Sequence, residues 1–236
     1  MIIFSQLSSI LNGQLIQLVL DEEIHYLLID SRKVLSSSKS LFFAINGVRN
    51  DGHDHILSAY DQGVRQFIVE REMDYKKYPL ANFIKVRSSV SALQQLAIHH
   101  RSTFKYPVIG ITGSNGKTIV KEWLYQMLSL KYNCVKNPGS YNSQIGVPLS
   151  VWQMNEQHEV GIFEAGISQP GEMTRLEQII QPTLGVFTNL GSAHNEGFES
   201  TRDKLIEKLK LFSQSKTLIY CADYEQIAHL ILEHKG

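Results

Sequence analysis

The sequence predicts an α/β fold built in two parts, residues 1–103 and residues 104–236. Short apolar runs bounded by turn residues fill the first part, as is typical of a small mixed α/β domain. In the second part, apolar runs alternate with helical patterns, which predicts right-handed crossovers and a mostly parallel sheet flanked by helices. A glycine-rich turn after the first strand of this sheet indicates where a ligand should bind.

The first part carries turn signals at Asn46-Gly47 and Asn50-Asp51-Gly52, each next to an apolar run. Gly63 marks the end of one helix, and Leu93 and Leu96 recur on one face of another. The predicted strands are Tyr26–Ile29, Leu41–Ile45, Gln66–Val69 and Phe83–Val86, and the predicted helices are His55–Gln62 and Ser89–His100.

The second part alternates between the two element types as far as its last residues, so we expect the chain to be a fragment of a longer protein. The predicted strands are Val108–Thr112, Val160–Glu164, Leu184–Thr188 and Thr217–Tyr220, and the predicted helices are Lys117–Leu130, Glu172–Ile180, Thr201–Phe212 and Tyr224–His234. The glycine-rich turn, Glu164 and Asn189 each come at the end of one of these strands. Because parallel strands end at one edge, these three features should meet there.

The glycine-rich turn has the composition of a phosphate-binding P-loop. Backbone N–H groups and a helix N-terminus attract phosphate oxygens, a lysine neutralises the terminal phosphates, and a hydroxyl binds Mg²⁺. Ile111 stands where the general pattern has glycine, so the match is to a shorter form. The alternative is a plain turn that caps a helix, with a solvated lysine. The residues predicted to bind nucleotide are Gly113, Ser114, Asn115, Gly116, Lys117 and Thr118.

Composition excludes several classes of function. Lys plus Arg and Asp plus Glu both number 23, so the chain has no bulk charge for nucleic acid or an anionic membrane. No apolar run approaches the length of a membrane span. Cys134 and Cys221 flank no metal-ligand spacing, and we expect both to be reduced core residues of a cytosolic protein.

Ordered motifs run through the second part: Gly110–Thr118, Asn137–Asn142 with Ile145–Pro148, Phe163–Gly166 with Pro170–Glu172, and Thr188–His194. Together they resemble the Mur ligases, the cytosolic ATP-dependent ligases that extend the peptidoglycan stem peptide. The Gly171-Glu172 pair and the run 193–198 are most similar to the family member that adds D-alanyl-D-alanine.

The resemblance implies a UDP-muramoyl-peptide-binding domain at 1–103 and part of an ATP-binding central domain at 104–236. It implies a cytoplasmic enzyme that uses ATP and Mg²⁺ to join D-alanyl-D-alanine to UDP-N-acetylmuramoyl tripeptide through an acyl phosphate. We expect a monomer that binds no nucleic acid and does not insert into membranes. The family's closing C-terminal domain has no counterpart here, so the chain by itself should be inactive, and fusion of its parent to an alanine racemase stays open.

The chemistry of such a ligase assigns roles to residues of the central domain. Lys117 should neutralise the β- and γ-phosphates, and Thr118 and Glu164 should hold a Mg²⁺ that bridges them. Asn142 should orient the substrate carboxylate or the γ-phosphate. Two alternatives are that Glu164 caps the next helix and that Asn142 is a simple turn residue; Ser140, where the family often has Asn, weakens any assignment in that loop.

The resemblance also implies a second magnesium bound by His194 and a carbamylated lysine. Lys208 falls in register for that lysine and borders the apolar stripe of its helix, while Lys204 is its rival. The alternatives are a solvated helix lysine and a loop histidine that bonds the backbone.

In the first part, Ser31 and Arg32 follow a predicted strand in a pattern that resembles the UDP-sugar domain. Hydroxyl and guanidinium donors suit diphosphate or uracil-ribose oxygens. The alternative is a turn with an internal ion pair between Asp30 and Arg32. His53 and His55 are expected to be loop and helix-start residues, because no third metal ligand lies nearby.

Three other functions stay open at this point. One is another Mur ligase or a folylpolyglutamate-synthase-like ligase with a different substrate, against which the Asp-Ser-Arg and Asp-Gly-His patterns favour a UDP-muramoyl ligand. Another is a non-catalytic nucleotide-binding module. The weakest is a P-loop phosphotransferase acting on a small alcohol, which would need a catalytic base that the sequence does not offer.

Overall fold

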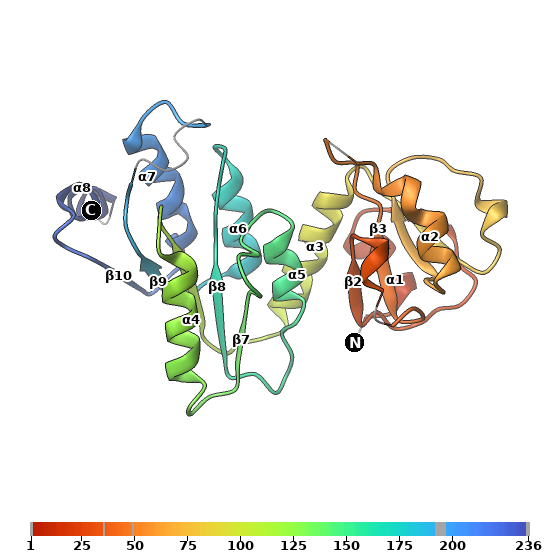
Figure 1. Cartoon of the computed structure of the whole chain (residues 1–236), viewed down its shortest axis with the longest axis horizontal. Coiled ribbons are helices and arrows are strands. Elements are labelled where there is room, and N and C mark those ends of the chain that lie inside the picture. The colour runs from red at the N-terminus through yellow and green to blue at the C-terminus, as the bar shows by residue number, and fades with distance from the viewer. Residues whose placement is uncertain (1, 35, 49, 192–196, 235–236) are drawn as a thin grey trace. The chain divides into compact units, whose positions relative to one another are not determined.

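The computed structural model describes residues 2–34, 36–48, 50–191 and 197–234. The chain divides into two compact units, Met1–Leu96 and Ala97–Gly236, and the division falls inside helix α3, Ser89–Ser102. Each unit has its own five-stranded sheet (Figure 1). The predicted α/β fold is therefore confirmed.

The first unit is built on a sheet with the strand order β1-β5-β4-β3-β2, parallel except for the β1–β5 pair. Phe42, Phe67 and Phe83 lie side by side on three adjacent strands, and the rings of Phe67 and Phe83 stack with centroids 5.2 Å apart. Burial of these rings holds the unit together. Its elements are α1 (Phe4–Ile10), β1 (Gln14–Gln17), β2 (Tyr26–Leu28), η1 (Ser31–Lys33), β3 (Ser40–Phe43), η2 (Gly52–His55), α2 (Ile56–Asp61), β4 (Gln66–Val69), η3 (Tyr75–Lys77), β5 (Asn82–Lys85) and α3.

The second unit is built on a fully parallel sheet with the strand order β10-β9-β6-β8-β7. The predicted strands and long helices are present, whereas β7 and α5 come from stretches with no predicted element. Its elements are β6 (Val108–Thr112), α4 (Lys117–Leu128), β7 (Cys134–Lys136), α5 (Gly146–Val151), β8 (Val160–Glu164), α6 (Glu172–Ile180), β9 (Leu184–Phe187), α7 (Thr201–Leu209), η5 (Lys210–Phe212), β10 (Thr217–Tyr220) and α8 (Glu225–His234).

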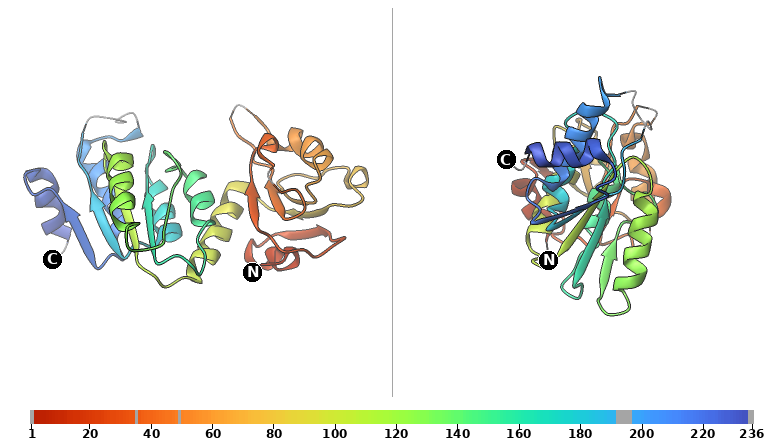
Figure 2. Two further views of the ribbon diagram at one scale, coloured as in Figure 1. Left: turned by 60° about the horizontal axis from the view of Figure 1, so that its bottom comes forward. Right: turned by 90° about the vertical axis from the view of Figure 1, so that its left-hand side faces the viewer.

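Helices cover this sheet on both faces. The green helix α4 packs on one face, against Ile111 and Ile162, while α6 and η5 pack on the other (Figures 1 and 2). On the second face, the covering residues approach the backbone of the sheet unusually closely at Gly110 and Gly185. A Cβ at Gly110 would lie 2.8 Å from Pro182, and one at Gly185 would overlap the ring of Phe212. This close approach seats η5 on the sheet and so places α7, which leads into it.

The first strand of this unit, β6, lies between β8 and β9, so the chain moves from β6 to one side of the sheet and later returns to the other side. Ligands in open parallel sheets bind beyond the carboxyl ends of the strands at such a switch point. The glycine-rich turn follows β6, Glu164 ends β8 and Asn189 follows β9. Their predicted meeting at one edge is thus what the fold produces.

One prediction about the cysteines is wrong. Cys134 is buried, as expected, but Cys221 is exposed, because it follows β10 at the margin of the sheet. Both are free thiols. Among the described residues, no helix has the length and apolar character needed to cross a bilayer.

Replacing Gly185 with alanine should lower the free energy of unfolding by about 1–3 kcal/mol, because the new methyl group forces the Phe212 ring away from the sheet. Urea denaturation of the chain measures the effect. In a Phe212→Leu background the same glycine change should be milder by about 1 kcal/mol. Equal effects in the two backgrounds would show that the ring does not limit this approach.

Candidate active site

Two glycines shape the turn between β6 and α4. Gly116 has φ +78° and is the N-cap of α4, and Gly113 has φ +147°. A Cβ at Gly113 would overlap the hydroxyl of Thr188, whereas a Cβ at Gly116 would meet nothing within 4 Å. Glycine is therefore required at 113 for both space and backbone conformation, and at 116 for conformation only.

The end of β9 fastens this turn in place. The backbone N–H of Ser114 donates to the carbonyl of Asn189 at 2.8 Å, and the N–H of Asn115 donates to Asn189 Oδ1 at 3.0 Å. Thr188 donates from its hydroxyl to the carbonyl of Asn115 at 2.6 Å. Two of the amides expected to bind phosphate are thus engaged by Asn189, and the N–H groups left for an anion are those of the first turn of α4.

Three buried or partly buried lysines converge on the turn. Lys117 Nζ and Lys208 Nζ both donate to the carbonyl of Gly113, each at 3.0 Å. Lys204 Nζ donates to the carbonyl of Gly191 at 3.4 Å. Lys204 and Lys208 are 1% and 3% exposed, so burial by itself does not distinguish the two rivals.

The pKa values of these lysines do distinguish them. Burial, followed by the positive charges of Lys117 and Lys204, lowers the pKa of Lys208 to about 7. Burial also lowers the pKa of Lys117, against the opposing effect of the Glu164 carboxylate, and it lowers the pKa of Lys204. The amines repel one another in a poorly solvated place, which a bound anion would relieve.

Glu164 is completely buried at the end of β8. Its Oε1 accepts a hydrogen bond from Asn142 Nδ2 at 3.1 Å, while its Oε2 has no partner among the described residues. An unpaired buried carboxylate oxygen is rare and suits a hard cation. Glu164 does not cap α6, since the N–H of Met173 in the first turn of α6 donates to Glu207 at 3.1 Å.

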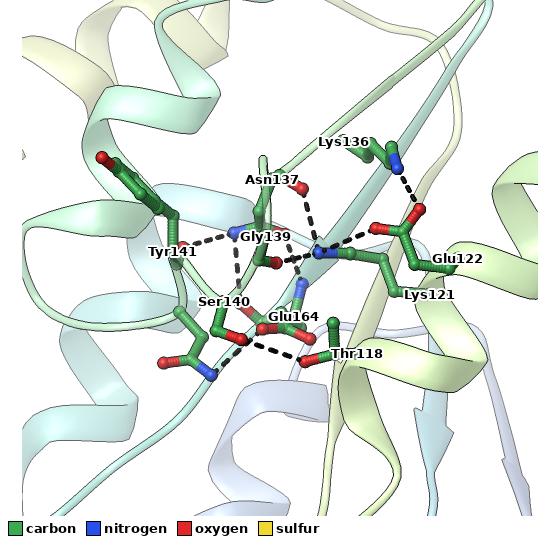
Figure 3. Close-up of polar contacts among 10 residues, drawn as sticks. Thr118, Lys121, Glu122, Lys136, Asn137, Gly139, Ser140, Tyr141 and Glu164 are labelled. Atoms are coloured by element: carbon green, nitrogen blue, oxygen red, sulfur yellow. Dashed lines mark hydrogen bonds and ion pairs between the residues drawn. The ribbon is translucent and has the colours of Figure 1, made fainter.

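The loop from Asn137 to Asn142 connects the two predicted magnesium ligands. Ser140 Oγ lies 3.5 Å from Thr118 Oγ1 (Figure 3). Asn142 holds Glu164 through the hydrogen bond given above. In this structure Asn142 orients a protein carboxylate, whereas the sequence suggested a substrate group. The loop therefore contacts both residues that are predicted to bind Mg²⁺.

Asn137 is a site residue that the sequence analysis missed. It is fully buried, and its Oδ1 accepts from the N–H of Glu164 at 2.7 Å while its Nδ2 donates to the carbonyl of Tyr141 at 2.7 Å. It lies directly after β7, at the same edge as Glu164, but β7 has only three residues and no sequence pattern predicts it, so no local signal marks Asn137.

The donor set fits Mg²⁺ better than a metal that prefers nitrogen or sulfur. Thr118 and Glu164 offer one hydroxyl and one carboxylate, and Mg²⁺ fills its remaining positions with water and phosphate oxygens. Within the described residues, no group of three or more His, Cys, Asp or Glu side chains is placed to hold a metal. His194 lies outside the described residues, so of the pair implied for a second ion the structure places only Lys208.

Ser31 and Arg32 lie in the first unit, on η1 just after β2. Arg32 donates from Nε and Nη2 to the two Asp30 oxygens at 2.9 and 2.8 Å, and this bond lowers the pKa of Asp30 to about 2. The internal ion pair weighed as an alternative is thus present. The Arg32 side chain stays 87% exposed and Ser31 is buried. A role for either in substrate binding stays a prediction.

The Asp51-Gly52-His53 motif forms a clamp within the first unit. His53 Nδ1 and Asp51 Oδ1 lie 2.6 Å apart, and the N–H of Glu70 donates to His53 Nε2 at 2.9 Å. Both ring nitrogens of His53 are therefore engaged by the protein. His55 ends η2 and is the N-cap residue of α2.

Comparison with known proteins identifies the family. The profile described as "Mur ligase middle domain" matches residues 111–236, and the one described as "Mur ligase family, catalytic domain" matches residues 23–101. The UDP-N-acetylmuramoyl-tripeptide–D-alanyl-D-alanine ligase of Borreliella burgdorferi is 34% identical over 204 residues, covering 83% of this chain and 44% of the relative. The enzyme of the same name from Bacillus subtilis is 34% identical over 203 residues, covering 85% and 44%.

Comparison with solved structures gives the same family. A crystal structure of MurF from Acinetobacter baumannii has a TM-score of 0.83 at 25% identity and covers 96% of this chain and 51% of its own. MurF from Thermotoga maritima in complex with ADP has a TM-score of 0.78 at 31% identity, covering 89% and 48%. The chain spans less than half the length of the two curated relatives above.

Replacing Asn137 with alanine should lower the free energy of unfolding by about 2 kcal/mol, because it leaves the buried N–H of Glu164 and the carbonyl of Tyr141 without their partners. Urea denaturation measures this loss. Asn155→Ala is the matched control, since Asn155 is exposed and its side-chain oxygen accepts from the nearby backbone N–H of Gln157, and it should change stability by about 0.5 kcal/mol at most. An Asn137 effect no larger than the control's would show that its bonds to Glu164 and Tyr141 do not stabilise the fold.

Proposed function

The chain belongs to the Mur ligase family, and we propose that it supplies the substrate- and ATP-binding parts of a ligase that joins D-alanyl-D-alanine to a UDP-N-acetylmuramoyl tripeptide. One observation carries the proposal. Repelling lysine amines and an unpaired carboxylate oxygen meet around a glycine turn at the carboxyl edge of a parallel sheet. Triphosphate and a divalent cation are the ligands that would neutralise both.

The reaction has two steps. The stem-peptide carboxylate attacks the γ-phosphorus of ATP, giving an acyl phosphate and ADP; the amine of D-alanyl-D-alanine then attacks the acyl carbon, forming the amide and releasing phosphate and a proton. Positioning and charge neutralisation dominate such a phosphoryl transfer. Mg²⁺, when bound, would neutralise charge on the phosphate oxygens.

The chain's own residues divide this work. Lys117 carries the positive charge for the β- and γ-phosphates, and it reaches them by leaving the Gly113 carbonyl that it now contacts. Thr118 and Glu164 are the oxygen ligands for the cation. Asn142 keeps one Glu164 oxygen occupied, so the other one stays aimed at the cation.

The choice of substrate is supported by the names of the relatives and by the chemistry of the first unit. Arg32 presents an exposed guanidinium that suits a diphosphate, and Ser31 lies directly beside it in the chain. We also propose that the reaction takes place in the cytoplasm, where ATP and nucleotide-linked substrates are found. A further part of the proposal is that the enzyme is a monomer. Sedimentation of the purified protein checks the monomer.

Two alternatives are separated by experiment. A ligase of the same family that adds a different amino acid would give its product only with that amino acid in a panel of muramoyl peptides and amines. A non-catalytic nucleotide-binding module would bind nucleotide without forming an amide. The chain has Lys117, Thr118, Glu164 and Lys208, the residues to which the ligase chemistry assigns roles, and their joint presence favours a catalytic site.

Joined to the parts that complete the length of its curated relatives, the chain should form UDP-muramoyl pentapeptide from the tripeptide, D-alanyl-D-alanine and ATP, and mass spectrometry of the product checks this. Lys117→Ala should weaken nucleotide binding by about 10–100-fold, because a charge-assisted contact is lost. Lys131→Ala is the matched control, an exposed lysine just beyond α4, and should bind nucleotide normally. Unchanged ATP-dependent ligation in Lys117→Ala would exclude the mechanism.

Lys208 should be the lysine that takes up CO₂, because a pKa near 7 leaves much of its amine neutral at pH 8, and the neutral amine is the reacting form. Carbon-13 NMR of the chain in labelled bicarbonate should give a carbamate signal that Lys208→Met abolishes. Lys204→Met, the matched buried control, should keep it. A signal lost only in Lys204→Met would transfer the role to Lys204.

A further inference from the structure

Lys121 is a completely buried lysine that none of the roles above uses. It lies on α4, one helical turn after Lys117 and Thr118, and its face of the helix is turned toward the site. Burying an ammonium group is unfavourable unless its protons find acceptors. The contacts that Lys121 makes therefore indicate why it is there.

Those contacts go to the Asn137–Asn142 loop. Lys121 Nζ donates to the carbonyl of Asn137 at 2.9 Å and to the carbonyl of Gly139, and the carboxylate of Glu122 lies 3.4 Å away (Figure 3). Lys136 pairs with the same Glu122 from β7. Two carbonyl dipoles and a shared carboxylate thus offset the buried charge, and the lysine joins α4 directly to the loop.

Burial does little to hold the tip of this loop, which hydrogen bonds such as that from Asn137 Nδ2 to the carbonyl of Tyr141 also stabilise. Pro138, Gly139, Ser140 and Tyr141 are exposed, so the tip contributes almost no burial. Yet Ser140 contacts Thr118 and Asn142 contacts Glu164, which are the two oxygen ligands assigned above to the cation. The position of this tip relative to α4 therefore sets both contacts at once.

We propose that Lys121 is a positioning residue that holds the Asn137–Asn142 loop on α4 and so aligns Thr118 and Glu164 for Mg²⁺. The proposal rests on the function proposed above for these two ligands. Within the described part of the chain, the ammonium group of Lys121 contacts Asn137, Gly139 and Glu122 and not the Gly113–Gly116 turn, so phosphate binding and metal binding should respond differently to its loss.

The test compares Lys121→Met with Lys136→Met, which removes a lysine from the same Glu122 without removing a contact to the loop. In Lys121→Met, the amides of Tyr141 and Asn142, which donate to carbonyls within the loop, should exchange with solvent at least about tenfold faster, while those of β6 keep their protection. The affinity for ADP in EDTA should stay within about twofold, and the gain in affinity on adding Mg²⁺ should fall about tenfold. Lys136→Met should match the wild type in all three measurements.

A second variant covers the case in which Lys121→Met does not fold. Gly139→Val places a branched residue at φ +51° with no atom within 4 Å of its Cβ, so it disturbs only the loop backbone. It should reduce the gain in ADP affinity on adding Mg²⁺ in the same way. The proposal would be overturned if the folded variants kept the wild-type rate of amide exchange in the loop and the wild-type gain in ADP affinity on adding Mg²⁺. A wild-type chain that binds no nucleotide would refute the proposed function, while loop exchange would still test the role of Lys121.

Discussion

Buried positive charge at the carboxyl edge of one sheet is the constraint on which the second unit depends. Lys117 and Lys208 share a single carbonyl, that of Gly113, and both have lowered pKa values. A carbonyl dipole offsets part of an ammonium charge but cannot replace water around two of them. The arrangement is stable because the rest of the fold holds it, and it becomes favourable when an anion enters.

The fold provides this support through close packing on the side of the sheet away from α4. Gly110 and Gly185 admit η5 so closely that α7 is carried to the carboxyl edge, where Lys204 and Lys208 are buried. Glu207, on the same helix, bonds the first turn of α6 and pairs with Lys210 at 2.6 Å. The segment formed by α7 and η5 thus takes part in the packing on the sheet, the capping of α6 and the burial of the two lysines.

Local chemistry made much of this predictable, and long-range contacts account for what was missed. Periodicity and turn signals within about ten residues predict three of these features: the glycine turn, the strand that ends at Glu164 and the helix that bears Lys208. Asn137 and Lys121 act across 27 and 16 residues, and an asparagine or lysine gives no local sign of such partners. The short elements α1 and β7 have too few residues for a period, and Cys221 is exposed because β10 lies at the sheet's edge.

The engagement of the glycine turn by Asn189 locates the phosphate site more narrowly than the motif does. Ser114 and Asn115 already donate their N–H groups to Asn189, and freeing them would forfeit hydrogen bonds worth about 1 kcal/mol each. The N–H groups at the start of α4 have no partner within the helix, and the N-cap residue Gly116 has no side chain to supply one. A phosphate therefore gains most at the helix start, beside Thr118, where the cation ligands and the Lys121-held loop also lie. Anion and cation sites are adjacent because one helix terminus serves both.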